Sequence, residues 1–187
     1  KNQTSKKYDI SKFINISYAG VAFKKDRDLT NMFNVVGDNS SYTLNVCGSY
    51  SSSYMKHSVG NDRINLLGRL EYGVAQSLLE DSDVLLHIGN KGSLQIPGKT
   101  YILLSIPLPI IYIRQETQHD PTYELLKKMK GVVFSYNDTE SIEQALNNIR
   151  INYENLLQDS KSRQSDQEFT QFEWTQILDN IIRHFHE

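Results

Sequence analysis

Short apolar runs alternate with helix-like runs along most of this 187-residue chain, and this alternation most constrains its fold. Each apolar run has the length of a strand, and glycine ends or follows several of them. Strands separated by helices pair in parallel through right-handed crossovers. We therefore predict an α/β fold, a doubly wound Rossmann-like parallel sheet of about six strands. The predicted strands cover residues 14–20, 43–48, 64–68, 84–88, 110–113 and 132–135.

Apolar residues at helical spacing predict the connecting helices. A longer helix follows the last strand, with Asn137 as its N-cap and an apolar stripe from Ile142 to Leu157. Residues 49–61 have weak periodicity, so a loop and a short irregular helix both stay open. The other helices are expected over residues 29–36, 72–80, 97–105 and 122–129.

The remaining segments suggest a domain with extensions. Residues 1–12 are polar and predicted to be disordered or the start of a linker, and residues 13–157 form the Rossmann-like domain. Residues 158–168 lack apolar side chains, which predicts a flexible linker. Residues 169–187 form an amphipathic C-terminal helix, packed either on its own domain or on a missing N-terminal domain. Since the chain opens on Lys1, we expect a piece of a longer protein.

Composition narrows the classes of function. The 20 basic and 22 acidic side chains nearly balance, so bulk charge gives no reason to expect nucleic acid as a partner. The single cysteine, Cys47, excludes an internal disulfide, lies in an apolar run and suits the reducing cytoplasm. No apolar run approaches the roughly 20 residues that span a bilayer.

The strand at residues 84–88 leads directly into a glycine-rich polar loop that contains Asn90, Gly92, Ser93 and Gln95. Lys99 follows at the start of the next helix. A loop between the carboxyl end of a strand and the start of a helix is where open α/β sheets bind phosphorylated ligands. The pattern therefore predicts a nucleotide or nucleotide-sugar site.

Two further loops add candidate residues to this site. The loop after the first strand runs from Gly20 through Lys25 to Arg27, and its cations suit a diphosphate, although it contains neither a dinucleotide fingerprint nor a P-loop. Arg69 follows the third strand and is a candidate for contact with a base. An ordinary solvated loop is the alternative at each of these places.

No residue set predicts covalent or metal catalysis. The five histidines are scattered, and His87, inside an apolar strand, is expected to be a core residue. No serine or cysteine lies in a nucleophile elbow, and no spacing suggests a metal site. The catalytic residues are left unassigned, and neither a metal nor a cofactor is expected.

Four patterns, taken in order, resemble the C-terminal donor-binding domain of GT-B fold glycosyltransferases of the group 1 type. The resemblance covers roughly residues 14–150, and the third pattern is the most specific. The patterns are residues 16–20 with the basic loop to Arg27, residues 64–69 with the helix after them, residues 83–90 leading to 96–101, and residues 109–111 followed by 131–133 and a helix.

The resemblance implies the donor half of a hexosyltransferase-type enzyme of polysaccharide biosynthesis. Its substrate would be a nucleoside-diphosphate sugar, and a missing N-terminal domain would hold the acceptor, so that this fragment would be inactive alone. That domain would also make any peripheral membrane contact. Carried over by position, the diphosphate would meet Gly20, Lys25, Arg27 and Lys99. The base and the sugar would meet Arg69, Asn90, Gly92, Ser93 and Gln95.

The chain departs from this family at two positions. The family usually has a glutamate three residues after the lysine, where it holds the ribose hydroxyls, but this chain has Ile102. An earlier glutamate of the family falls on Leu94. An apolar side chain cannot accept hydrogen bonds from ribose. The alternative function is therefore a non-catalytic relative that binds a partner or regulates, and an unrelated doubly wound domain is a third.

Overall fold

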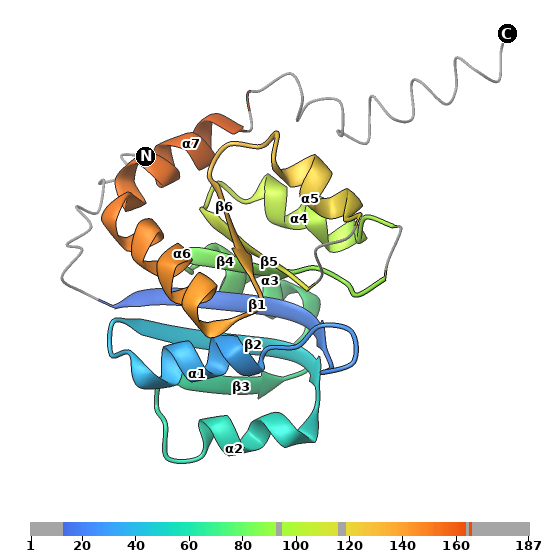
Figure 1. Cartoon of the computed structure of the whole chain (residues 1–187), viewed down its shortest axis with the longest axis vertical. Coiled ribbons are helices and arrows are strands. Elements are labelled where there is room, and N and C mark those ends of the chain that lie inside the picture. The colour runs from blue at the N-terminus through green and yellow to red at the C-terminus, as the bar shows by residue number, and fades with distance from the viewer. Residues whose placement is uncertain (1–12, 93–94, 116–118, 164, 166–187) are drawn as a thin grey trace, which may run out of the picture.

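The computed structural model describes residues 13–92, 95–115, 119–163 and 165, in which six strands form one parallel sheet (Figure 1). The strands are β1 (Ile14–Ala22), β2 (Tyr42–Tyr50), β3 (Ile64–Gly68), β4 (Val84–Ile88), β5 (Ile110–Arg114) and β6 (Val132–Tyr136). Their order in the sheet is β3-β2-β1-β4-β5-β6. The predicted α/β, doubly wound architecture is confirmed, and each strand lies within two residues of its predicted limits.

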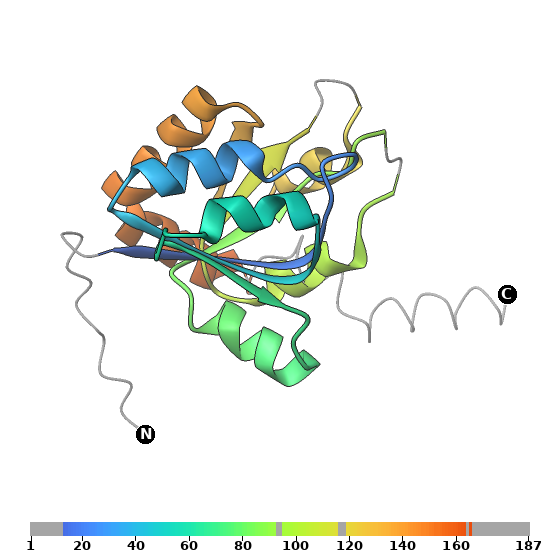
Figure 2. The same ribbon diagram turned by 90° about the horizontal axis from the view of Figure 1, so that it is seen from below.

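Helices cover both faces of the sheet (Figure 2). One face carries α1 (Thr30–Asp38), α2 (Met55–Ser58) and α6 (Thr139–Ile151); the other carries α3 (Tyr72–Glu80), α4 (Gly98–Ser105) and α5 (Pro121–Leu126). A 3-10 turn, η1 (Ser52–Tyr54), precedes α2, and α7 (Tyr153–Arg163) follows α6. None of the described helices is both long and apolar enough to cross a membrane.

The core consists of two apolar layers separated by the sheet. The layer under α1 and α6 contains Met32, Phe33 and Leu146. The layer under α4 and α5 contains Leu104 and Leu126. All five residues of β4 are buried, as the continuous apolar run at 84–88 predicts for a strand covered on both faces.

Two predictions for the C-terminal part are wrong. The single helix expected to start at Asn137 begins one residue later, because Asp138 is its N-cap and accepts a hydrogen bond from Ser141 N. It also divides at Asn152 into α6 and α7. The flexible linker predicted over residues 158–168 is wrong for residues 158–163, which belong to α7. The predicted terminal segments, residues 1–12 and 169–187, lie outside the described residues.

Arg163 explains why a segment without apolar side chains is ordered. Its fully buried guanidinium donates hydrogen bonds of 2.8–3.1 Å to the carbonyls of Leu104, Ile106, Leu108 and Lys130. Burial lowers the pKa of Arg163 to about 10. This value is still well above neutral pH, so the side chain is charged there. These bonds tie the end of α7 to the segments on either side of β5.

We expect Arg163→Met to lower the free energy of unfolding by about 3 kcal/mol, because four buried carbonyls lose a charged donor. Urea unfolding, monitored by circular dichroism, measures the change. Lys161→Met, on an exposed position of the same helix, is the control and should change stability little. Equal losses in both variants would contradict this role for Arg163.

Candidate functional site

The strand order reverses between β1 and β4, and this is where open α/β sheets bind their ligands. β1 pairs with β2 at every position from Ile14 to Ala22, but it pairs with β4 only at Ile16 and Ser17. Beyond these positions the two central strands continue without pairing to each other. The loops that leave their carboxyl ends, residues 23–29 and 89–97, are therefore the first candidates for ligand contact.

Two glycines shape the end of β1. Gly20 and Gly48 lie opposite each other in β1 and β2, with φ angles of +148° and +120°. A side chain on Gly48 would place its Cβ 2.0 Å from the carbonyl oxygen of Gly20, so the close approach requires glycine. A Cβ on Gly20 would lie 3.4 Å from Lys99 Nζ, so the end of the lysine side chain lies next to the backbone of Gly20.

Lys99, in the first turn of α4, reaches across to β1. Its Nζ donates a hydrogen bond of 3.2 Å to the hydroxyl of Tyr18 and lies 4.4 Å from the centroid of that ring. The Tyr18 hydroxyl in turn donates to the carbonyl of Val21 at 2.6 Å. Burial, together with the positive charge of Arg27, lowers the pKa of Lys99 to about 7. Burial also raises the pKa of Tyr18, which stays a neutral phenol.

Arg27 joins the loop after β1 to the loop after β4. Its Nε donates to Oδ1 of Asn90, and its Nη1 donates to the carbonyl of Val21 at 3.3 Å. A backbone hydrogen bond of 3.2 Å from Lys91 N to Asp26 O runs parallel to this contact. The guanidinium is thus held in place by neutral oxygens.

Among the described residues, no carboxylate is paired with Arg27 or Lys99. The ion pairs between described residues are Arg114–Asp120 and Lys127–Glu124, and neither involves Arg27 or Lys99. The charge of Arg27 is close enough to lower the pKa of Lys99, and two such cations with no negative partner among the described residues suit an anionic ligand.

The other predicted site residues lie at varying distances from this pair. Arg69 is exposed at the end of the edge strand β3, where its Nε donates to Ser49 Oγ at 2.9 Å, so β2 separates it from β1. Lys25 is exposed in the loop after β1, and Gly92, with φ +63°, and Gln95 are exposed after β4. Ser93 and Leu94 lie outside the described residues. The structure therefore brings together Gly20, Arg27, Asn90 and Lys99.

Beneath this group, His87 confirms its expected place in the core. It is fully buried, and its Nε2 lies 2.8 Å from Thr100 Oγ1, next to Lys99 in α4. Burial and the charges of Lys99 and Arg27 lower its pKa well below the usual range, so the ring is neutral. In the described part of the chain, no cluster of His, Cys, Asp or Glu is placed to hold a metal ion.

Sequence reasoning missed a polar network that connects the loops after β1, β5 and β6. Gln115 Oε1 accepts hydrogen bonds of 3.2 Å from Asp28 N and Asn137 Nδ2, and Asn137 Nδ2 also donates to Asp28 O at 3.0 Å. Asn31 Nδ2 donates to Asn137 O at 2.7 Å. The signal in the sequence is an amide side chain directly after each of two strands. The network fixes the loop that carries Arg27.

We expect Lys99→Met to raise the melting temperature of the ligand-free chain, because it removes a desolvated charge. The gain should be largest at or below pH 7 and shrink towards pH 10. In that range the unfolded lysine, with a pKa of about 10.4, holds a proton that the folded one has lost, so the wild type gains stability as pH rises. Thermal unfolding of both proteins across pH 6–10 measures this. A pH-independent difference would contradict the lowered pKa.

Solved structures of low sequence identity have a similar fold. HepE of Anabaena in complex with UDP-glucose has a TM-score of 0.74 at 9% identity, over 95% of this chain and 50% of that chain. The C-terminal domain of LpcC, a group 1 family glycosyl transferase of Francisella tularensis, has a TM-score of 0.56 at 10% identity, over 81% of this chain and 84% of that chain. A Listeria monocytogenes protein described as a UDP-N-acetylglucosamine 2-epimerase has a TM-score of 0.61 at 12% identity, over 94% of this chain and 46% of that chain.

No family model matches the chain, and no curated protein matches its sequence. The chain spans about half the length of the HepE structures that it resembles. The separately solved LpcC domain is matched over most of its own length, so the likeness is one of whole domains. The expected resemblance in fold to the C-terminal domain of GT-B glycosyltransferases is confirmed.

Proposed function

We propose that this domain binds the diphosphate of a nucleoside-diphosphate sugar between the ends of β1 and β4, as the donor-binding half of a glycosyltransferase. The observation that carries the proposal is the pair of cations, Arg27 and Lys99, without a carboxylate partner among the described residues. Gly20 lies next to the amino group of Lys99, and Asn90 orients Arg27. HepE in complex with UDP-glucose supports the choice of ligand, because its fold is similar.

In this proposal the two cations act on the leaving group. As the bond between sugar and diphosphate breaks, negative charge grows on the diphosphate, and fixed positive groups nearby lower the energy of that state. Arg27 is already held by Asn90 and Val21, so little reorganisation is needed. Lys99, with a pKa of about 7, takes up a proton when the anion arrives and then contributes its full charge.

The acceptor is expected to bind outside this chain. Because the chain spans about half of the HepE structures, we propose that a further domain of the same protein presents the acceptor. Transfer of a hexose during polysaccharide synthesis in the cytoplasm is the reaction that we expect of the assembled enzyme. Any contact with a membrane would come through that domain.

The first test is isothermal titration calorimetry of the 187-residue chain with UDP, GDP, ADP and TDP. We expect one of them to bind, and Arg27→Ala and Lys99→Met each to weaken binding at least tenfold, because each removes a charge-assisted contact. Titrations in two buffers with different ionisation enthalpies should show proton uptake above pH 7, and Lys99→Met should abolish it.

Lys128→Ala provides a matched loss of charge at an exposed position in the segment after α5. It should bind the nucleotide as the wild type does. If all four nucleotides fail to bind, or if Lys128→Ala weakens binding as much as Lys99→Met does, the proposed site is wrong.

Ile102 favours the second candidate, a non-catalytic relative that binds a partner or regulates. It lies on α4 one turn after Lys99 and is 43% exposed, and it cannot accept hydrogen bonds from ribose. A non-catalytic relative would not require tight donor binding. This candidate predicts weak or absent nucleotide binding by a domain that is nevertheless correctly folded.

We expect Ile102→Glu to tighten nucleoside-diphosphate binding by about tenfold, since a carboxylate can accept hydrogen bonds from two ribose hydroxyls. Pyrophosphate, which has no ribose, should not gain. Calorimetry with both ligands measures the difference, and Ile102→Gln separates hydrogen bonding from charge. An equal change for both ligands would contradict a ribose contact at this position.

A further inference from the structure

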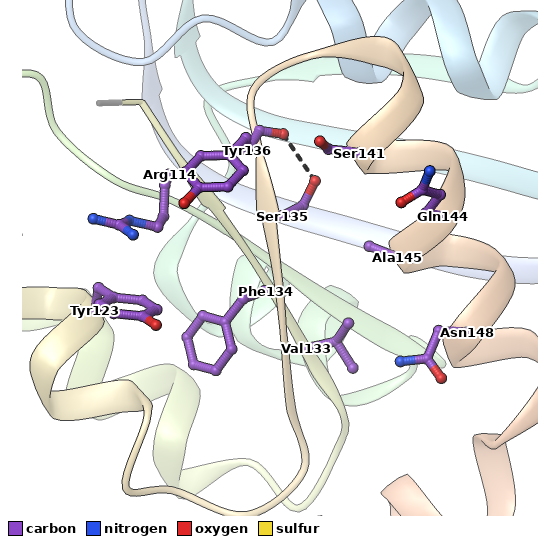
Figure 3. Close-up of a pocket in the computed structure, with 10 residues that line it drawn as sticks. All are labelled: Arg114, Tyr123, Val133, Phe134, Ser135, Tyr136, Ser141, Gln144, Ala145 and Asn148. Carbon is purple, nitrogen blue, oxygen red and sulfur yellow. Dashed lines mark hydrogen bonds between the residues drawn. The ribbon is translucent and has the colours of Figure 1, made fainter. Parts of the chain in front are cut away.

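A cleft of about 490 Å³ lies along the edge strand β6, away from the β1–β4 switch point (Figure 3). We call it the edge cleft. Aromatic rings line the side towards α5, and polar side chains line the side towards α6, with β6 between them. The rings belong to Tyr123, Phe134 and Tyr136, and the polar side chains to Ser141, Gln144 and Asn148.

The aromatic side is held in place by an arginine. The Cζ of Arg114 lies 4.1 Å from the centroid of the Tyr123 ring and 5.6 Å from that of Tyr136. Tyr123 and Phe134 meet edge to face, with centroids 5.0 Å apart. Tyr136 is nevertheless 48% exposed. The cleft therefore offers the half-exposed ring of Tyr136 beside the guanidinium of Arg114.

The polar side has amide groups with capacity to spare. Gln144 uses its Nε2 to donate to Glu140, and Asn148 uses its Oδ1 to accept from Asn152. The oxygen of Gln144 and the Nδ2 of Asn148 have no hydrogen-bond partner among residues 13–92, 95–115, 119–163 and 165. One free acceptor and one free donor thus lie a helical turn apart on the same face of α6.

The edge of β6 adds a few backbone groups. Ile110 N donates to Gly131 O, and the β5–β6 register then directs the backbone groups of Val132 and Phe134 away from β5. The carbonyl of Tyr136 accepts a hydrogen bond of 2.8 Å from Ser135 Oγ. The free edge is therefore short, and on the α6 side of the cleft polar side chains stand beside the buried Val133 and Ala145.

We propose that the edge cleft binds a saccharide. A pyranose ring presents an apolar C–H face, which suits the exposed Tyr136 ring, and hydroxyls around its rim, which suit the amides of Gln144 and Asn148. Among the described residues that line the cleft, Arg114 is the one with a charged side chain, and its Nε lies 3.9 Å from Asp120 Oδ2, so this charge is balanced and suits a neutral ligand. This site goes beyond the proposed donor site and does not depend on it.

The test is an NMR titration of the 15N-labelled 187-residue chain with maltotetraose, cellotetraose and N-acetylchitotetraose. We expect at least one of them to shift the amide signals of Phe134, Tyr136 and Gln144. Tyr136→Ala should weaken that binding about tenfold, and Gln144→Ala several-fold. Tyr136→Phe keeps the ring and should bind within about threefold of the wild type.

Gln76→Ala changes a partly buried glutamine of α3 that bonds to Glu80, and as the matched control it should leave the titration unchanged. The melting temperature of each variant shows that it is folded. Three outcomes would overturn the proposal: no tetrasaccharide shifts these signals, Tyr136→Ala binds as the wild type does, or only an extended valine- and threonine-rich nonapeptide binds at the cleft. UDP binding by the same sample reports separately on the donor site.

Discussion

The short pairing between β1 and β4 is the constraint on which the candidate site depends. These central strands share only two paired positions, although β1 pairs with β2 along its whole length. The loop after β1 and the first turn of α4 can therefore bring Arg27 and Lys99 together at the switch point, from opposite sides. The asparagine and glutamine network behind the first loop keeps Arg27 there without a carboxylate.

A second feature of the candidate site is the free-energy cost of burying the positive charge of Lys99. Burial of the Lys99 charge beside the positive Arg27 lowers the stability of the domain without a ligand, and an anion next to both side chains would offset this cost. Two titratable side chains in the same region are uncharged, because Tyr18 stays a neutral phenol and His87 a neutral imidazole. A domain with this balance should be most stable when its ligand is present.

Periodicity predicted the sheet and its helices well because the strands are short apolar runs, and β4 and β5 are buried on both faces and leave a continuous apolar pattern. It failed at residues 158–163, since the order there comes from Arg163 and backbone carbonyls, and neither leaves an apolar signal. The sequence also indicated Lys99 and Arg27 as candidates. It could not show the contact of Lys99 with Tyr18, nor the distance of Arg69 from the cation pair, because both depend on strand order.

The buried hydrogen bonds of Arg163 also fasten the end of α7 to the rest of the domain. The guanidinium gathers carbonyls from the end of α4, the segment before β5 and the segment before β6, and Ser160 lies against Gly131 so closely that no Cβ fits there. The end of α7 is thus part of the rigid body and moves with the sheet. A rotation of the sheet would therefore carry the end of α7 with it as one body.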